Sequence, residues 1–258
     1  AWNGLMISAF AKAGAAFSES RYLEAAAKAA RFLKRNLTSA GRLLRSWRGE
    51  PGAIPGFAED YAFLIRGLLD LYEASWDADW LSWALELQER QDELFRDEDG
   101  GGYFGSAAGD PLVPVRMKED YDGAEPAANS ISALNLLRFA RMLHDESYET
   151  RARKIIGASR EALARAPIAV PQMLVALDLA LSPPAQAVVA GTRGTPEVKA
   201  WNARLHHEFA PRRMLLLADD SSTFLQRVPA LASMKPLNGR PALYLCENFT
   251  CQAPQLLE

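Results

Sequence analysis

An acidic segment offers the clearest chemistry in the sequence. Residues 119–125 read Glu-Asp-Tyr-Asp-Gly-Ala-Glu, and two further acids, Glu59 and Asp60, stand at the start of an apolar run. Hydrolysis of a glycoside needs paired carboxyl groups, one as a general acid and the other as a base or nucleophile. We therefore take Asp60, Asp122 and Glu125 as candidate catalytic residues of a site that acts on sugars.

Aromatic and amide side chains accompany these acids. Aromatic faces bind the apolar surface of a sugar ring, while carboxylates and amides bind its hydroxyl groups. The candidate substrate-binding residues are Trp2, Asn3, Glu59, Tyr61, Asp120, Tyr121 and Asn129. A structural interpretation of the same acids stays open, because capping and the helix dipole also favour carboxylates in a first helical turn.

Two kinds of helix alternate along residues 3–181, and they must position these side chains. Helices that are apolar nearly all round are predicted to be buried, and amphipathic helices are predicted to lie at the surface. The first kind spans residues 5–17, 57–73, 127–143 and 168–181, and the second spans residues 21–37, 80–95 and 148–163. A repeat of about sixty residues predicts stacked helical hairpins, as in a solenoid or a closed (α/α) ring.

The connections between these helices are unequal in length. Turns from a buried helix to a surface helix are short, whereas the reverse connections, 38–56 and 96–125, are long. The long loops therefore gather beside the N-termini of the buried helices, where the acids lie. Long loops on a rigid scaffold are a common place for a functional site.

The helical pattern ends at Ser182-Pro183-Pro184, since a residue before proline is disfavoured in a helix. Apolar runs alternate with helical stretches beyond this point, which predicts a small parallel α/β unit. The runs and stretches span residues 187–190, 196–209, 214–218, 222–228 and 242–246. We thus expect a helical part at residues 1–181 and an α/β segment at residues 182–258.

Cys246 and Cys251 are separated by four residues. A thiol at a strand end that leads into a helix N-terminus has a lowered pKa, so a redox role is one interpretation of the pair. Burial as two ordinary thiols is the other. Two cysteines do not make a disulfide framework, which fits a reducing, cytoplasmic setting.

Several partners are not expected. A net charge of −3 without a basic block gives no reason to expect nucleic acid or an anionic membrane. No apolar run is long enough to cross a bilayer. The three histidines lack the spacing of metal ligands, so we expect no metal and no cofactor.

Several motifs resemble the family of spermatogenesis-associated protein 20, a group of thioredoxin-domain-containing proteins. The motifs are Ala1-Trp2-Asn3-Gly4-Leu5, Asp60-Tyr61-Ala62-Phe63, Gly101-Gly102-Tyr103-Phe104, Asp122-Gly123-Ala124-Glu125-Pro126 and Cys246-Glu247-Asn248-Phe249-Thr250-Cys251. The resemblance implies a thioredoxin-like domain followed by a six-hairpin, glycosidase-type toroid. This sequence would be the C-terminal portion, a view that its start at Ala1 inside a helical pattern favours. The ring would then be incomplete.

The toroid is also similar to the N-acylglucosamine and cellobiose 2-epimerases, which use a pair of histidines in the lumen. No histidine lies on a predicted inner helix here, so their mechanism is not implied.

The sequence supports two functional hypotheses. The first is a carbohydrate-active or carbohydrate-binding toroid, which as an enzyme would be glycoside hydrolase-like or sugar-modifying and would take a saccharide. The alternative is a non-catalytic scaffold or regulatory body for an N-terminal thioredoxin-like domain of the same chain. An incomplete ring also exposes apolar flanks, from which we expect self-association.

Overall fold

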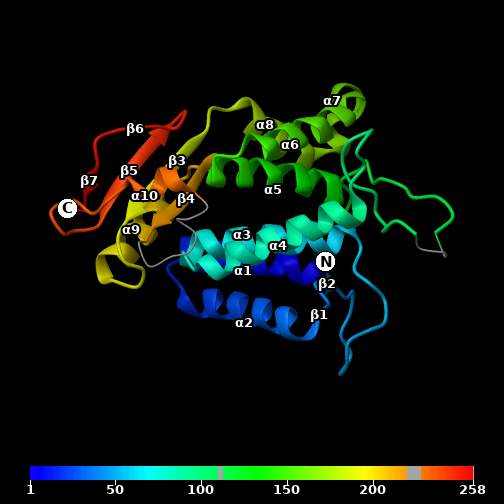
Figure 1. Cartoon of the computed structure of the whole chain (residues 1–258), viewed down its shortest axis with the longest axis horizontal. Helices are drawn as coiled ribbons and strands as arrows, with labels where there is room; N and C mark the ends of the chain where they lie inside the picture. The colour runs from blue at the N-terminus through cyan, green and yellow to red at the C-terminus, as the bar shows by residue number, and fades with distance from the viewer. Residues whose placement is uncertain (110–112, 220–227, 258) are drawn as a thin grey trace.

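Helical hairpins make up most of the protein (Figure 1). The computed structural model describes residues 1–109, 113–219 and 228–257. The hairpins are α1 (Trp2–Ala16) with α2 (Ser20–Asn36), α3 (Ala58–Ser75) with α4 (Ala78–Phe95), and α5 (Ala128–Leu143) with α6 (Glu146–Ala158). The helical part ends with α7 (Arg160–Arg165), the 3₁₀ turn η1 (Pro167–Ala169) and α8 (Pro171–Leu181).

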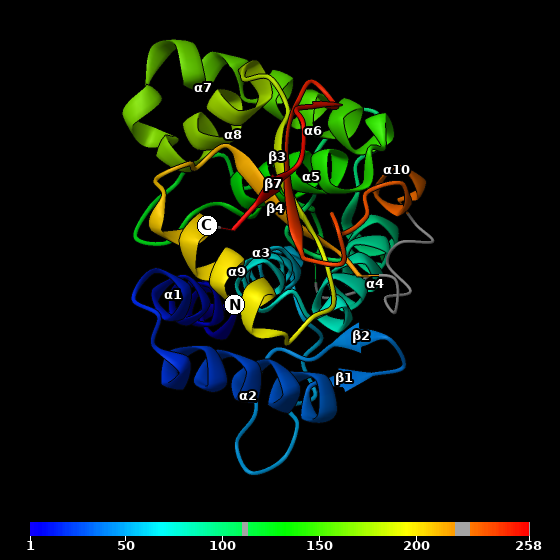
Figure 2. The ribbon, with the colours of Figure 1, turned by 90° about the vertical axis from the view of Figure 1, so that its left-hand side faces the viewer.

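The helices form an inner and an outer layer. Helices α1, α3, α5 and α8 pack side by side in that order, and α2, α4 and α6 cover them from outside (Figure 2). Helices α3 and α5 carry buried side chains almost all round, because neighbours enclose them on every side. The prediction of a mainly α fold of helical hairpins in a toroid arrangement is confirmed. In the part of the chain that the structure describes, the inner row is an open arc.

Two glycines bring α1 and α3 into close contact. A Cβ atom on Gly4 would lie 2.5 Å from the carbonyl carbon of Phe63, and one on Gly67 would lie 2.6 Å from the carbonyl oxygen of Gly4. A side chain at either position would therefore meet backbone atoms, which cannot swing aside. The two helices pack backbone to backbone where they cross.

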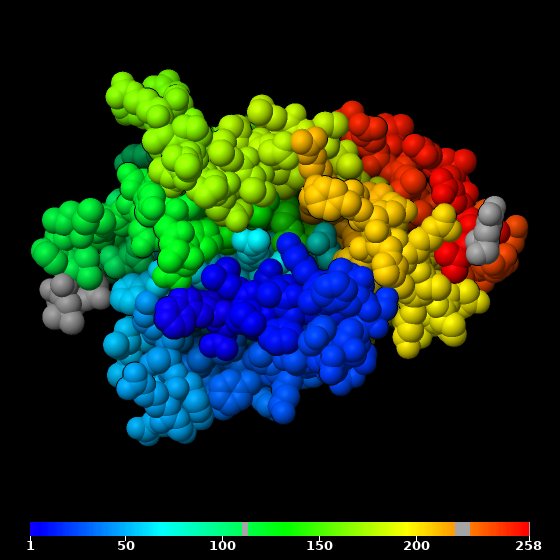
Figure 3. Space-filling model, turned by 180° about the vertical axis from the view of Figure 1, so that it is seen from behind, coloured from blue at the N-terminus to red at the C-terminus, as the bar shows by residue number. Residues whose placement is uncertain are grey.

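Helix α1 differs from its prediction. It was expected to be buried on most sides, yet Trp2, Met6 and Phe17 expose 71%, 51% and 74% of their surface. The reason is that α1 stands at one end of the arc, where no described element covers its outer flank. Seen from behind, α1 and α8 lie on either side of a recess in which part of α3 is visible (Figure 3).

A five-stranded sheet follows the helices in sequence. Its strand order is β4-β3-β5-β6, and β7 also pairs with β5. Its elements are β3 (Ala185–Ala190), α9 (Pro196–His207), β4 (Arg213–Ala218), α10 (Pro229–Ala232), β5 (Ala242–Glu247), β6 (Thr250–Cys251) and β7 (Gln255–Leu256). The small α/β segment is confirmed.

The prediction of a parallel sheet is only half right. Strands β3 and β4 are parallel with α9 as their crossover, but β5 runs antiparallel to β3. Antiparallel neighbours need no crossover, so β5 can start at the end of the sheet where β4 stops. Residues 220–227, which hold most of the helix predicted at 222–228, lie outside the described residues.

The sheet lies at the C-terminal ends of α3 and α5, opposite the long loops (Figure 1). Glu73 of α3 accepts a hydrogen bond from the backbone N–H of Leu215 in β4 at 3.2 Å. Arg138 of α5 forms ion pairs with both Glu73 and the buried Asp70, each at 2.8 Å. A charged cluster thus joins the sheet to the two central helices.

The helical layers contain no membrane-spanning candidate. Within residues 1–109, 113–219 and 228–257, no helix combines the length and the apolar character needed to cross a bilayer.

Two short strands precede α3. Strands β1 (Thr38–Ser39) and β2 (Arg42–Leu43) form a hairpin in the first long loop. In the second long loop, residues 98–100 form a turn, and Tyr103 forms an isolated β-bridge with Arg96. Both long loops lie beside the N-terminal ends of the inner helices, as predicted.

Candidate functional site

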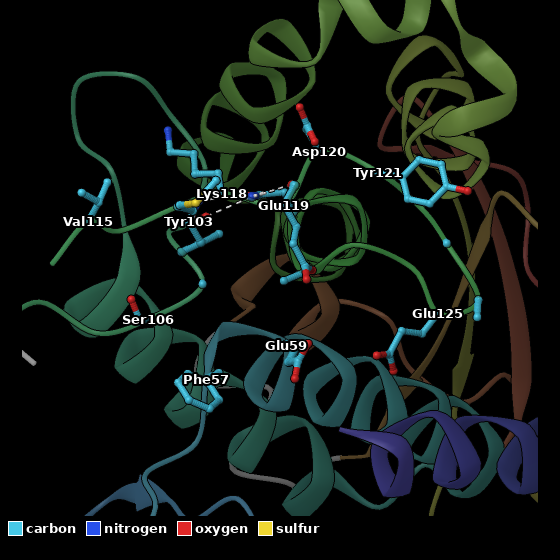
Figure 4. Close-up of a pocket in the computed structure, with 16 residues that line it drawn as sticks. Phe57, Glu59, Tyr103, Ser106, Val115, Lys118, Glu119, Asp120, Tyr121 and Glu125 are labelled. Atoms are coloured by element: carbon cyan, nitrogen blue, oxygen red, sulfur yellow. Dashed lines mark hydrogen bonds between the residues drawn. The ribbon is translucent and has the colours of Figure 1, made fainter. Parts of the chain in front are cut away.

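A pocket of about 810 Å³ opens at the N-terminal ends of α3 and α5. The first turn of α3 forms one wall, and the other walls come from residues 103–106 and 115–125 and from the first turn of α5 (Figure 4). Its lining contains the acids Glu59, Glu119, Asp120 and Glu125 and the aromatic residues Phe57 and Tyr121. The pocket therefore lies where the long loops meet the ends of the inner helices.

Three carboxyl groups face a common space in this pocket. Those of Glu59, Glu119 and Glu125 point into it from α3 and from two places in the loop, whereas Asp120 points away (Figure 4). Partial burial raises the pKa of Glu119, and the negative charges of Glu59 and Glu125 raise it further. A hydrogen bond from the backbone of Ala128 opposes these effects without cancelling them.

Glu119 was not among the candidates from sequence. It begins the acidic segment, but nothing in the sequence distinguishes it from Asp120 beside it. The distinction comes from the loop backbone, which turns one carboxyl group into the pocket and the next one out of it (Figure 4). The hydrogen bond with the first turn of α5 fixes the inward orientation.

Each of the other two pocket carboxylates has a partner. Glu59 pairs with Arg45 at 2.7 Å. Glu125 accepts a hydrogen bond from the indole nitrogen of Trp2, also at 2.7 Å. Lys118 lines the pocket too, but its ammonium group is held by Asp97 at 2.5 Å and by the carbonyl of Gly101 at 2.6 Å. Arg45 and Lys118 are thus paired with other acids. Neither Glu119 nor Glu125 has a cationic partner among the residues described.

Asp60 lies outside the pocket lining. Its carboxylate accepts hydrogen bonds from the amino group of Ala1 at 2.7 Å and from the backbone N–H of Phe57 at 2.8 Å, and it pairs with Arg45 at 3.1 Å. The bond to Phe57 caps α3. The structure therefore gives this catalytic candidate a structural role.

Asp122 also has a capping role. One of its carboxylate oxygens accepts a hydrogen bond from the N–H of Ala127 at the start of α5, at 2.7 Å. The other accepts hydrogen bonds from the N–H groups of Gln172 and Met173 in the first turn of α8, at 2.8 and 3.2 Å. The side chain is buried and its oxygens are occupied, so this second catalytic candidate links two helices.

The remaining candidates divide between the pocket and its surroundings. Tyr121 is 62% exposed at the pocket wall, and Trp2 reaches the rim through Glu125. Tyr61, in the first turn of α3, points into the interior, where its hydroxyl accepts a hydrogen bond from the N–H of Leu43 at 2.9 Å. Asn3 lines a separate groove of about 430 Å³ beside α2.

Asn129 lines the pocket, but its amide group holds the loop. Its oxygen accepts from the N–H of Tyr103 at 2.8 Å, and its nitrogen donates to the carbonyl of Tyr103 at 2.9 Å. The hydroxyl of Tyr103 in turn donates to Asp92 at 2.5 Å. Burial and the charge of Asp92 raise the pKa of this phenol well above its usual value, so it keeps its proton. Asn129 thereby positions the pocket wall.

Cys246 and Cys251 form a disulfide. The expectation of two ordinary buried thiols is therefore wrong, whereas the redox role stays a prediction. A two-residue turn at Asn248 and Phe249, both with positive φ, folds β6 back on β5 and places the two cysteines opposite each other. The spacing of four residues is therefore that of a hairpin, since no helix begins at Cys246.

No cluster of three or more histidine, cysteine or carboxylate side chains suited to a metal occurs among the described residues.

Relatives of the chain were found by sequence. No family model matches it. Spermatogenesis-associated protein 20 from Homo sapiens is 42% identical over 98% of this chain and 34% of its own length, and the protein of the same name from Mus musculus gives the same values. An uncharacterized protein of Caenorhabditis elegans is 35% identical over 98% of this chain. The chain thus spans about a third of the length of the curated relatives it matches, 34% to 35%.

A cellobiose 2-epimerase from Bacillus thermoamylovorans B4167 aligns with 60% of this chain and 42% of its own, at 17% identity and a TM-score of 0.49. A likeness of this size says nothing about activity.

Proposed function

The chain is homologous, along nearly its whole length, to about a third of spermatogenesis-associated protein 20, and we propose that its pocket at the ends of α3 and α5 binds carbohydrate. The observation that carries the proposal is the convergence of Glu59, Glu119 and Glu125 on one cavity of about 810 Å³. Such a volume suits a small saccharide. Carboxylates accept hydrogen bonds from sugar hydroxyl groups.

Aromatic side chains in the same pocket support this choice of ligand. Tyr121 presents an exposed ring at one wall, and Phe57 lies at another (Figure 4). Their faces suit the apolar surface of a sugar ring, while the carboxylates suit its rim of hydroxyl groups. An anionic ligand fits less well, because three glutamates would repel it and the nearby cations are already paired.

The pocket also has the parts for acid–base chemistry on such a ligand. Glu119, whose pKa is raised, holds its proton to a higher pH than an ordinary glutamate and suits the role of general acid. Glu125 is exposed at the pocket wall and suits the role of proton acceptor. These assignments replace Asp60 and Asp122, whose oxygens are used as helix caps.

The test is ligand binding by the intact chain. Calorimetric titration and thermal-shift measurements with neutral mono- and disaccharides should show binding that is lost in Glu119→Gln/Glu125→Gln. The control is Glu24→Gln, which removes an exposed carboxylate from the outer helix α2 and should bind as the parent does. Saccharide binding that survives the double substitution would move the site elsewhere. Absence of binding to every sugar tested would overturn the proposal.

The scaffold alternative has one observation in its favour. Apolar side chains on α1 and α8, among them Met6 and Val175, face solvent at the two ends of the arc. Large exposed apolar surfaces often mark docking faces. We propose as the second function that these flanks receive other parts of a longer parent chain, including its N-terminal thioredoxin-like domain. Co-purification of the separately expressed remainder with this chain, abolished by Met6→Glu/Val175→Glu, would support it. Failure to co-purify would count against it.

A further inference from the structure

The Cys246–Cys251 disulfide closes a hairpin at the far end of the molecule from the pocket. Cys246 and Cys251 are paired across β5 and β6. They form the next residue pair away from the turn after Glu247 and Thr250, which close it. Strand β6 contains only two residues, and on its other side no described strand pairs with it. The disulfide therefore lies in the outermost element of the sheet.

The two sulfur-bearing residues differ in their access to solvent. Cys246 is 5% exposed because β5 packs against β3, whereas Cys251 is exposed. A thiolate from solution can therefore approach the sulfur of Cys251, with the sulfur of Cys246 as the leaving group. Exchange of this kind depends on which sulfur can be reached.

The segment that follows is held to the protein by few other contacts. Residues 247–253 are all exposed. Besides its two residue pairs with β5, the hairpin is held by the N–H groups of Asn248 and Gln252, which donate to the carbonyls of Pro184 and Leu245, each at 2.9 Å. Beyond it, β7 pairs with β5 through two residue pairs, and Leu257 packs on the core and accepts a hydrogen bond from Arg240 at 3.0 Å. Short exposed pairings of this type open readily. The covalent bond is therefore a principal constraint on the position of residues 248–257.

The hairpin turn also covers a histidine. The ring of Phe249 lies 4.4 Å, centroid to centroid, from that of His144 at the C-terminal end of α5. On its other side His144 contacts the amide group of Gln186 at 2.8 Å. Movement of the hairpin would uncover His144 and leave its Gln186 contact in place.

We propose that Cys246–Cys251 is a thiol–disulfide exchange site for small dithiols or dithiol proteins, and that its reduction releases residues 248–257 from the sheet. A thiolate of the dithiol attacks the sulfur of Cys251, forms a mixed disulfide and expels Cys246 as a thiolate. The second thiol of the dithiol then displaces Cys251. The dithiol is oxidised to its disulfide, and the protein gains two electrons and, at neutral pH, protons on its two thiols.

This step is independent of carbohydrate binding. The hairpin and the pocket lie at opposite ends of α5, so either proposal can fail without the other. The exchange site stands on three observations, which are the exposure of Cys251, the short pairings of the segment and the contact between the rings of Phe249 and His144.

The experiment uses the oxidised, intact chain and dithiothreitol without denaturant. Alkylation and mass spectrometry should show both cysteines free while the helical circular dichroism is unchanged. Reduced glutathione should form its mixed disulfide on Cys251 and not on Cys246. Hydrogen exchange should report a loss of amide protection over residues 250–256.

A second readout separates release of the segment from mere reduction. Burial lowers the pKa of His144, and its contact with Gln186 opposes that effect. The pKa of His144, followed by NMR titration, should rise toward its ordinary value after reduction. The double variant Cys246→Ser/Cys251→Ser should show the same rise with or without dithiothreitol. Phe249→Ala should raise this pKa and leave the disulfide intact.

Either of two results would overturn the proposal. The first is a disulfide that resists excess dithiothreitol until the chain unfolds. The second is a reduced chain whose residues 250–256 keep their amide protection and whose His144 titrates as it does in the oxidised chain.

Discussion

Neighbouring carboxylates in one loop have different roles in this protein. Glu119 points into the pocket, Asp120 points out of it, and Asp122 is buried between two helices (Figure 4). Backbone direction alone separates them, because all three belong to one short stretch of sequence. A cluster of acids in a sequence therefore indicates a place in the fold, and the individual roles depend on the loop conformation.

At the scale of the residue, Glu119→Gln should change the pH dependence of stability. The raised pKa of Glu119 means that the folded protein binds its proton more tightly than the unfolded chain does. Its ionisation therefore lowers stability as pH rises through and above its usual range. Removing the charge should stabilise the protein at pH 7, by roughly 0.5 kcal/mol because the side chain is partly exposed.

Urea unfolding at pH 7 and pH 4 measures this effect. The gain should shrink at pH 4, where Glu119 of the parent is largely protonated. Asp120→Asn is the matched control, since this neighbour points to solvent (Figure 4). An equal gain at both pH values would show that charge repulsion in the pocket is not its cause.

At the scale of the element, Asp122 substitutes for local caps that the sequence of α8 lacks. The residue before α8 is Val170, whose side chain makes no capping hydrogen bond. Asp122 supplies the missing acceptor from a position fifty residues earlier in the chain. The same carboxylate binds the N–H of Ala127, so the start of α5 and the start of α8 depend on one side chain.

Asp122→Ala should therefore destabilise the protein by about 2 to 4 kcal/mol, since helix caps contribute about 0.5 to 2 kcal/mol each and this one is buried. Chemical denaturation with circular dichroism measures the loss. Asp120→Ala, two residues away and exposed, should stay within about 0.5 kcal/mol of the parent. Similar stabilities for the two variants would contradict the capping role.

Helices α1 and α3 should not tolerate a methyl group at their crossing. In Gly67→Ala the new Cβ would lie 2.6 Å from the carbonyl oxygen of Gly4, so one helix must shift. We expect a loss of about 1 to 3 kcal/mol, even though alanine favours helices over glycine by about 1 kcal/mol.

Gly157→Ala on α6 is the control for this substitution. Nothing lies within 4 Å of the new Cβ atom, so helix propensity should act alone and stabilise the protein. Thermal unfolding of the two variants gives the comparison. If Gly67→Ala raised the melting temperature as Gly157→Ala does, the close contact would be disproved.

Periodicity was enough to predict the hairpins. Helices α3 and α5 could be recognised because a helix enclosed by neighbours has few polar positions, and α2 because its charges fall on one side. The direction of β5 could not be predicted, because a short apolar run looks the same in a parallel and an antiparallel strand. The disulfide could not be predicted either, because it depends on a two-residue turn at Asn248 and Phe249 that the sequence does not identify.

The sequence indicated the end of the helices at which the pocket lies, but only some of the side chains that line it. A cavity lies at the N-terminal ends of α3 and α5, where the long loops were expected to build a site, and Glu125 and Tyr121 line it. Asp60 and Tyr61 also belong to the first turn of α3, but a helix turns its successive residues in different directions. In this turn, Glu59 faces the pocket, whereas Asp60 and Tyr61 face the interior.

At the scale of the whole molecule, the open arc should make the chain self-associate. Met6 on α1 and Val175 on α8 are 51% and 50% exposed, and Trp2 and Leu181 extend the same flanks. Burying such apolar surface is favourable by about 25 cal/mol per Å². Sedimentation equilibrium should therefore show a mass that grows with protein concentration.

Met6→Glu/Val175→Glu should shift the equilibrium toward monomer. Lys28→Glu, which introduces an acid on the exposed side of α2, should leave it unchanged. A parent chain that stays monomeric at high concentration would show that these flanks do not associate.

The contact between Gly4 and Gly67 has a geometric consequence for the arc. Bare backbone lets α1 and α3 come closer together than side chains would allow. These are the inner helices of the first two hairpins, and a double layer that is tighter on its inner side must curve. Bulkier residues along this line would widen the inner edge and flatten the curvature. Two hydrogen atoms in place of methyl groups thus help to set the curvature of the arc.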